Sequence, residues 1–293
     1  MISIGFLGLG KMGEVMAPLL LEAGYDLSVW NRSPEKANFL VDLGAKKVLT
    51  PAILASTTDI VISMLTDDAA IRAVYEGPEG LLSVPVKGKL FIDMSTLRPP
   101  TVHDIAKQVS KAGASFVDAP VSGTVAPAKF GKLLVLCGAS NEDFERARPI
   151  LDIFGRRIVH AGPVGQGTLL KLVVNLPLAV YWASLAEAIA MGTHGGLNLK
   201  LMLDTIQDSS AALAVLGLKV PTILGDPGPV AFDVASMKKD LLSMLATGEK
   251  SGVPMPATNG ALDNYSATLN GGFGDADAVE IIRFVTEEMI QLD

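Results

Sequence analysis

Short apolar runs alternate with amphipathic stretches through the first half of the chain. The amphipathic stretches, such as 101–112 and 142–154, have the spacing of helices. The apolar runs are typical of strands and lie at residues 2–7, 27–30, 59–65, 89–95, 114–119, 132–137 and 157–160. Strands that alternate with helices predict a parallel sheet covered on both faces. Ligands of such sheets bind at the carboxyl ends of the strands.

The pattern changes after Gly167. Residues 168 to about 193 contain no turn cluster and predict one long helix, apolar on nearly all sides, which we expect to be buried between two domains or two subunits. A membrane span is the rival interpretation. Four residues argue against a span: Lys171, Asn175, Pro177 and Glu187. Further helices are predicted at 199–209, 234–250, 256–269 and 276–292.

We therefore predict two domains. Residues 1–163 form an α/β domain of the Rossmann type, with a doubly wound parallel sheet. Residues 164–293 form an all-α domain that includes the long helix. The length of 293 residues and the 49% hydrophobic content are sufficient for two cores and argue against disorder.

Charge, cysteine and histidine content argue against several classes of partner and ligand. The net charge is −7 and no basic run exceeds two residues, which argues against nucleic acid as a partner. Cys137 is the single cysteine, lies in an apolar run and is expected to be a buried strand residue of a protein in a reducing compartment. The three histidines are far apart, so no metal site is predicted. The chain begins with a strand rather than a signal segment, so we expect a cytoplasmic protein with no membrane partner.

A glycine-rich turn follows the first predicted strand and precedes a predicted helix. It consists of Gly8, Leu9, Gly10, Lys11, Met12 and Gly13. In a dinucleotide site the first glycine allows a tight turn, the second lets the pyrophosphate approach, and the third lets the helix pack on the strand. The helix N-terminus attracts the phosphates. The turn predicts a dinucleotide site rather than an ordinary loop.

The end of the second strand indicates which dinucleotide binds. NAD sites place an acidic residue about 20 positions after the glycines. This chain instead has Asn31, followed by Arg32, Ser33 and Lys36. A guanidinium can pair with a 2′-phosphate and stack on adenine, whereas an acid would repel the phosphate. We predict NADP(H) in preference to NAD(H).

Other strand ends fall on the same rim of the predicted sheet. They carry Met64, Leu65, Thr96 and the loop of Ser122, Gly123 and Thr124. Hydroxyl and backbone N–H groups of this loop would suit a carboxylate, although an ordinary loop remains an equal alternative.

Lys171 and Asn175 lie four positions apart on the long helix and share a face. Because an ammonium is costly to bury, a lysine in this apolar stretch should be paired or titrate low, as a general acid/base requires. The alternative is a lysine that extends its charge to solvent. Lys239 and Asp240, taken alone, indicate a solvated charge cluster.

Taken together, these segments resemble the β-hydroxyacid dehydrogenase family. The resemblance covers nearly the whole chain and includes GFLGLGKMG, VWNRSPEK, FIDMST, DAPVSG, GxGxxxKxxxN from Gly165 to Asn175, KKDL, and the tail at 272–275. It implies that Lys171 is the catalytic acid/base and that Asn175 helps to hold it and the substrate. It also implies assembly as dimers or tetramers through the α domain.

The resemblance assigns further roles. Ser122, Gly123 and Thr124 would hold a substrate carboxylate, Thr96 and Lys239 would lie near the nicotinamide and its ribose, and Phe232 and Asp240 near the substrate. The chain departs from the family at Thr124, where a glycine is usual, and at Arg98, where a small residue is common. Because Thr124 adds a side chain at the pocket, the family's substrates do not transfer directly.

The expected activity is NADP(H)-dependent interconversion of a small β-hydroxy acid and its semialdehyde or keto form. Glyoxylate, succinic semialdehyde and 3-hydroxyisobutyrate are the substrates that the resemblance implies. An imine reductase is one alternative, although such enzymes generally lack a lysine at the position of Lys171 and the Ser-Gly loop. A non-catalytic NADP-binding module is the other.

Overall fold

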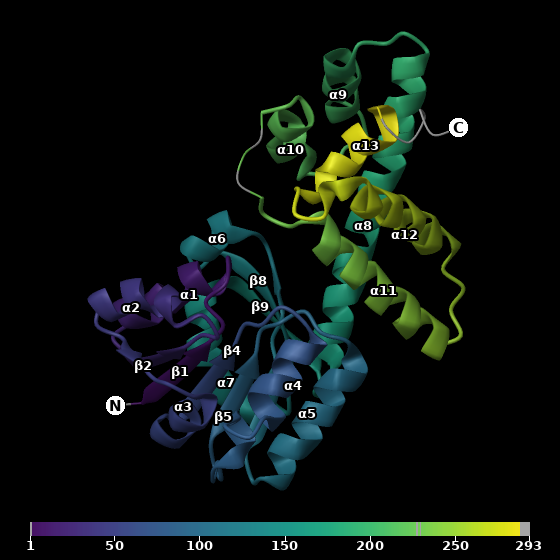
Figure 1. The fold of residues 1–293 in the computed structure, drawn as a ribbon. Helices are drawn as coiled ribbons and strands as arrows, with labels where there is room; N and C mark the ends of the chain where they lie inside the picture. The colour runs from purple at the N-terminus through teal and green to yellow at the C-terminus, as the bar shows by residue number, and fades with distance from the viewer. Residues whose placement is uncertain (1, 227, 229, 288–293) are drawn as a thin grey trace. The chain divides into compact units, whose positions relative to one another are not determined.

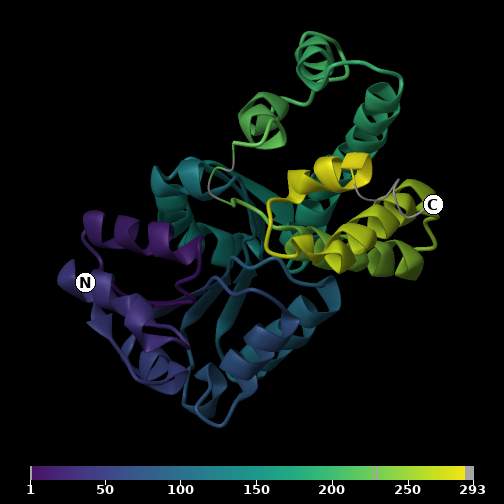
Figure 2. The ribbon, with the colours of Figure 1, turned by 45° about the horizontal axis from the view of Figure 1, so that its top comes forward.

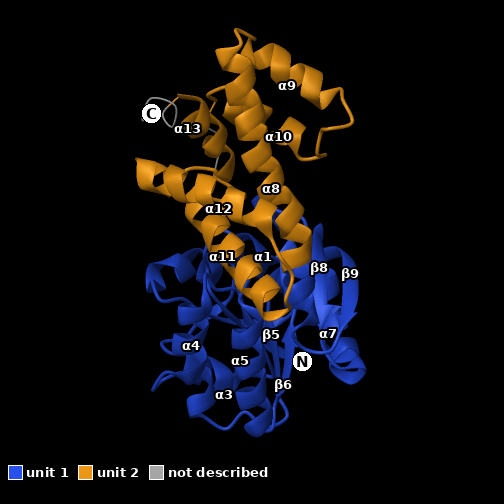
Figure 3. Ribbon diagram, turned by 90° about the vertical axis from the view of Figure 1, so that its right-hand side faces the viewer, with its two compact units in different colours: residues 1–171 blue, residues 172–293 orange. Residues whose placement is uncertain are grey.

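The computed structural model describes residues 2–226, 228 and 230–287 (Figure 1). The chain divides into two compact units, Met1–Lys171 and Leu172–Asp293, which Figure 3 colours separately. The long helix α8, Gln166–His194, contributes residues 166–171 to unit 1 and the rest to unit 2.

Unit 1 is built on a nine-stranded sheet. The strands are β1 Ser3–Leu7, β2 Asp26–Trp30, β3 Lys46–Lys47, β4 Ile60–Ser63, β5 Leu90–Asp93, β6 Ser115–Asp118, β7 Val121–Ser122, β8 Leu133–Gly138 and β9 Gly155–Gly162. The order β3-β2-β1-β4-β5-β6 is parallel throughout, so the predicted Rossmann fold is confirmed. Cys137 is buried in β8, as predicted.

The sheet departs from the predicted parallel pattern at one edge. Strand β8 runs antiparallel to β6 and β7, and parallel only to β9. The connection from β6 to β8 contains β7 and the short helix α6, Val125–Lys129, which leaves too little chain for a full crossover. The strand therefore returns in the opposite direction.

Helices cover both faces of the sheet, because each face carries the apolar side chains of buried strands. One face packs against α1 Gly13–Glu22, α2 Asn38–Asp42, α6 and α7 Asn141–Phe154. The other packs against α3 Pro51–Thr57, α4 Asp68–Glu76 and α5 Pro99–Lys111. Figure 2 shows α1 and α2, in purple, on one side of the strands and α4 and α5, in blue, on the other. Short turns complete the unit at η1 Pro34–Ala37 and η2 Leu81–Ser83.

Unit 2 is helical, as predicted. Its elements after α8 are α9 Leu199–Gln207, α10 Leu216–Ile223, α11 Val234–Lys250, α12 Pro256–Thr268, η3 Leu269–Phe273, η4 Ala278–Glu280 and α13 Ile281–Glu287. Helix α11 has its predicted bounds, and α10 was not predicted. The last predicted helix, 276–292, begins later and its end lies outside the described residues.

Within the single chain, α8 is buried on one side only, so its burial against a second subunit stays a prediction. Ala179, Ala186 and Ile189 are buried in the core of unit 2, whereas Val173 and Met191 are 57% and 76% exposed. By length and composition, α8 is the one helix in the described residues that could span a membrane, and 39% of its most apolar window is buried. One side of α8 packs in the core of unit 2, and this packing accounts for part of the apolar composition of the helix.

Candidate functional site

The glycine-rich turn has three glycines with different surroundings. Gly8 has φ +92°, and a Cβ there would lie 2.2 Å from the carbonyl oxygen of Met64. A Cβ at Gly13, the first residue of α1, would lie 1.9 Å from the carbonyl oxygen of Gly8. A Cβ at Gly10 would have no heavy atom within 4 Å. Backbone packing therefore requires Gly8 and Gly13, while Gly10 faces open space that a phosphate group could enter.

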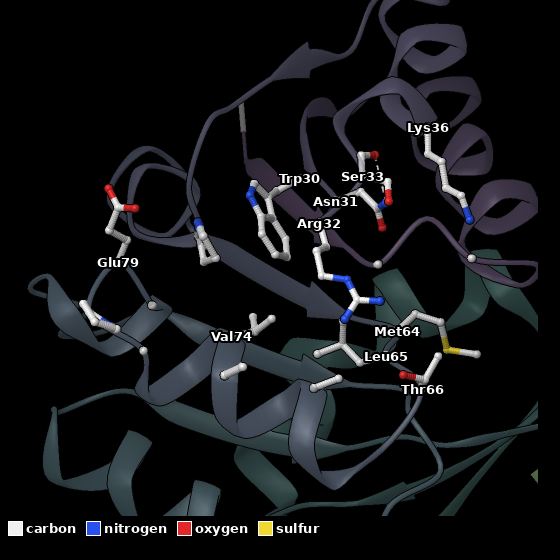
Figure 4. Close-up of a pocket in the computed structure, with 18 residues that line it drawn as sticks. Trp30, Asn31, Arg32, Ser33, Lys36, Met64, Leu65, Thr66, Val74 and Glu79 are labelled. Carbon is white, nitrogen blue, oxygen red and sulfur yellow. Dashed lines mark hydrogen bonds between the residues drawn. The ribbon is translucent and has the colours of Figure 1, made fainter.

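A cavity of about 460 Å³ opens beside this turn (Figure 4). Its predicted lining residues are Gly8, Gly10, Asn31, Arg32, Ser33, Lys36, Met64 and Leu65. The cavity lies at the carboxyl ends of β1, β2 and β4, where a doubly wound sheet binds its ligand. The remaining predicted residues of the turn do not line it: Leu9 and Gly13 are buried, Lys11 is exposed and Met12 is half-buried.

Asn31 joins the glycine-rich turn to the end of β2. Its Oδ1 accepts a hydrogen bond from the Leu9 N–H at 2.9 Å, and its Nδ2 donates to the carbonyl oxygen of Ser33 at 3.0 Å. The amide therefore serves the backbone of the cavity wall on both sides. Arg32 extends into the cavity toward Leu65 in Figure 4. In the described part of the chain no carboxylate is paired with Arg32 or Lys36, so both cations can serve an anionic ligand.

One wall of the cavity was missed from the sequence. It comprises Trp30, Pro51, Thr66, Ala70, Ala73, Val74, Gly77, Pro78, Glu79 and Gly80. The residues on α4 have the i, i+3, i+4 spacing of one helical face, so the amphipathic pattern of α4 was an available signal. Ala70, Ala73 and Val74 give the α4 part of this wall small apolar side chains, which suit the flat face of a purine base.

The loops after β4 and β5 are tied together behind the cavity. Ser63 Oγ and Ser95 Oγ both donate to Asp93 Oδ1, at 2.7 and 2.8 Å, and the Leu65 N–H donates to Ser95 Oγ at 2.8 Å. Asp93 is 1% exposed. Burial raises the pKa of Asp93 to about 6, against the opposing effect of the two hydroxyl donors. The buried acid thus fixes the backbone that leads to Thr96, which is half-buried.

The loop proposed for a substrate carboxylate follows β7. Ser122 pairs with Leu134 of β8, and Gly123 has φ +133°. A Cβ at Gly123 would lie 2.7 Å from Leu133 Cδ2, so a glycine is required there. Thr124 is the N-cap residue of α6, but its side chain makes no capping hydrogen bond. Its hydroxyl, at this half-buried position, is not used to cap the helix.

Lys171 lies in the first turns of α8, at the end of unit 1, and is 7% exposed. The other predicted residues belong to unit 2. Asn175 Nδ2 donates to Asp240 Oδ2 at 3.2 Å, and Lys239 Nζ lies 3.3 Å from Asp240 Oδ1. Asp240 is 1% exposed, so it does not belong to a solvated charge cluster.

Phe232 is half-buried against the core of unit 2. Its carbonyl oxygen accepts a hydrogen bond from the Ala278 N–H at 2.8 Å. The structure thus gathers most of the predicted cofactor residues around one cavity of unit 1, and groups Asn175, Lys239 and Asp240 within unit 2. Among the described residues, no three His, Cys, Asp or Glu side chains form a cluster that could hold a metal ion.

The cavity fits the phosphate and adenosine part of a nicotinamide dinucleotide. The open approach at Gly10 and the N-terminus of α1 suit the pyrophosphate, and the apolar wall suits the adenine base. The fold and this cavity define a dinucleotide-dependent protein of the Rossmann class.

Known proteins identify the class more closely. Residues 3–162 match the family profile described as the NAD binding domain of 6-phosphogluconate dehydrogenase, and residues 165–285 match the profile described as NAD-binding of NADP-dependent 3-hydroxyisobutyrate dehydrogenase. Glyoxylate/succinic semialdehyde reductase 2, chloroplastic, of Arabidopsis thaliana is 34% identical over 281 residues, which cover 96% of this chain and 78% of that protein.

Two further proteins of known identity are similar to this chain. The 3-hydroxyisobutyrate dehydrogenase of Pseudomonas aeruginosa is 36% identical, over 85% of this chain and 86% of its own length. The structure of Mycobacterium tuberculosis 3-hydroxyisobutyrate dehydrogenase with L-serine superimposes with a TM-score of 0.86 at 26% identity, covering 97% of this chain and 99% of that chain. The chain belongs to the β-hydroxyacid dehydrogenase family. It is an NAD(P)-dependent oxidoreductase that acts on CH–OH groups.

Proposed function

We propose that the protein prefers NADP(H) and interconverts a small β-hydroxy acid with its semialdehyde or keto form. The observation that carries the cofactor preference is the end of β2. Asn31 is engaged with the backbone, no acid takes its place, and Arg32 and Lys36 line the same cavity without a carboxylate partner in the described residues. A 2′-phosphate would supply the missing anion.

Lys171 is proposed as the general acid/base. A bound nicotinamide supplies or accepts the hydride at the substrate carbon. In reduction, the Lys171 ammonium would donate a proton to the carbonyl oxygen, and in oxidation the neutral amine would remove the hydroxyl proton. Its low exposure keeps water from competing for that proton.

The other roles follow the family resemblance. We propose that Ser122, Gly123 and Thr124 bind the substrate carboxylate and that Thr96 and Lys239 contact the nicotinamide and its ribose. For Asn175, Phe232 and Asp240 we propose substrate contacts or support of Lys171. Glyoxylate and succinic semialdehyde are the first substrates to test, and 3-hydroxyisobutyrate is the next.

The test is NADPH oxidation at 340 nm with glyoxylate, succinic semialdehyde, methylmalonate semialdehyde, tartronate semialdehyde and one cyclic imine, each repeated with NADH. Turnover of an aldehyde acid with NADPH, and little with NADH, is expected. Turnover of the imine alone would identify an imine reductase, and NADPH binding without any turnover would indicate a non-catalytic module.

The cofactor preference has its own variant. Arg32→Glu should weaken NADPH binding strongly and NADH binding little, because the change replaces an attractive charge by a repulsive one. Lys47→Glu is the matched control, since it makes the same charge change at an exposed lysine of β3 outside the cavity. Equal weakening of both cofactors by Arg32→Glu would show that Arg32 does not read the 2′-phosphate.

We also propose a cytoplasmic homodimer or homotetramer. The exposed side of α8 carries Val173, Val174 and Met191, an apolar composition that water does not favour. Sedimentation should give a multiple of the 30.7 kDa chain mass, and Met191→Asp should lower it. A monomeric wild-type protein would contradict the proposal.

A further inference from the structure

Helix α8 begins without a capping side chain of its own. Its first residue is Gln166, and the Leu169 N–H donates to the carbonyl oxygen of Gly165 at 3.0 Å, so Gly165 occupies the N-cap position. The first N–H groups of a helix have no partner within the helix, and an N-cap side chain normally accepts from one of them. A glycine cannot do so.

Asp118, at the end of β6, supplies the missing acceptor. Its Oδ1 accepts from the Gly165 N–H at 2.6 Å and its Oδ2 accepts from the Thr168 N–H at 2.7 Å. In a local capping box two side chains satisfy the N-cap and third-residue N–H groups. Here one carboxylate satisfies both, from 47 and 50 residues away in the sequence.

The surroundings leave no freedom for this carboxylate. Asp118 is 0% exposed. A Cβ at Gly138 would lie 2.4 Å from Asp118 Oδ1, and a Cβ at Gly167 would lie 2.4 Å from the carbonyl oxygen of Leu136. The start of α8 therefore lies directly against the backbone ends of β6 and β8.

We infer that Asp118 is a positioning residue for Lys171. The carboxylate holds the first turn of α8, which ends three residues before Lys171, against the strand that continues into the Ser122 loop. This junction would thus fix the position of Lys171 relative to the loop that begins at Ser122, the proposed carboxylate-binding loop. This inference rests on the proposed function of Lys171. A displacement of about 1 Å at such a group can cost on the order of 100-fold in rate.

The test is Asp118→Asn, which keeps the shape of the side chain but leaves one of the two N–H groups facing an amide nitrogen. We expect kcat for the aldehyde substrate to fall about 10- to 100-fold. The NADPH dissociation constant, measured by fluorescence, should stay within about twofold because Asp118 does not line the cofactor cavity. Ser140→Ala is the matched control: it removes the cap of α7, where Ser140 Oγ accepts from the Asp143 N–H at 3.1 Å, and should leave kcat unchanged.

Amide exchange in the wild-type protein gives a second measurement. The Gly165 and Thr168 N–H groups should exchange slowly, because each is hydrogen-bonded and buried. Free exchange of both would overturn the proposal, as would a folded Asp118→Asn enzyme with unchanged kcat. A variant that fails to fold would also overturn it, since Asp118 would then serve the fold and not Lys171. Inactive wild-type enzyme would instead refute the proposed function, and with it the role of Asp118 toward Lys171.

Discussion

Alanine at position 13 should lower the free energy of unfolding, whereas alanine at position 10 should weaken cofactor binding without lowering stability. At position 13 the new Cβ would lie 1.9 Å from the Gly8 carbonyl oxygen, whereas real Cβ atoms essentially never come within 3.0 Å of such an atom. The turn and α1 must therefore separate by about 1 Å, and overpacking of this kind costs about 1–3 kcal/mol of the free energy of unfolding.

At position 10 the new Cβ would meet no protein atom within 4 Å. Gly10→Ala should leave the free energy of unfolding unchanged or raise it by up to about 1 kcal/mol, since alanine restricts the unfolded chain. The methyl group would instead occupy the approach to the turn. Loss of one hydrogen bond to a charged phosphate costs about 1.5–3 kcal/mol, which weakens NADPH binding about 10- to 100-fold.

Thermal unfolding of the free protein and NADPH titration by fluorescence measure the two effects separately. Gly13→Ala should lower Tm by about 2–4 °C for each kcal/mol lost. Gly10→Ala should leave Tm unchanged or raise it by a few degrees, and should bind NADPH more weakly. Gly260→Ala, on α12, is the control, because a Cβ there also has no neighbour and lies far from the turn in sequence. Wild-type affinity in Gly10→Ala would refute the pyrophosphate placement, and an unchanged Tm in Gly13→Ala would refute the packing argument.

Three further predictions concern Lys171, Asn31 and Asp118. Lys171→Ala should reduce turnover about 10²- to 10⁴-fold and leave NADPH affinity unchanged. The control Lys200→Ala, at an exposed lysine of α9, should change neither turnover nor affinity. Near-normal turnover in Lys171→Ala would show that Lys171 is not catalytic. Asn31→Ala should weaken NADPH and NADH binding alike, because it releases the Leu9 N–H and loosens the turn; a selective loss of NADPH would contradict this. Burial raises the pKa of the Asp118 carboxyl from 3.8 to about 7. The native state therefore binds the carboxyl proton more tightly than the unfolded state does, and the contribution of Asp118 to stability falls as pH rises from about 4 to about 7. Asp118→Asn should then cost less stability in urea at pH 8 than at pH 5, and equal costs would show that burial does not control this carboxyl.

The sequence alone was sufficient for features that depend only on neighbouring residues, such as a tight turn, a buried strand or the ends of a helix. Gly8 and Gly13 could be recognised because a tight strand-to-helix turn leaves no room for a Cβ. The parallel strands β1, β4 and β5 could be predicted because buried strands are continuous apolar runs. Helix α11 had clear ends because Asp233 caps it and Lys250 lies in its last turn. The order of such motifs along the chain also identified the family.

Features that join distant segments required the folded structure. The reversal of β8 depends on how much chain connects it to β6, and apolar periodicity carries no direction. The α4 wall of the cavity depends on which helix covers the end of β4, and the periodicity of α4 marks an apolar face without saying what that face meets. From the sequence, Asp118 was one more acid at the end of a strand, and only the fold brings its oxygens to the Gly165 and Thr168 N–H groups. Periodicity records which side of an element is buried, whereas packing determines what that side meets.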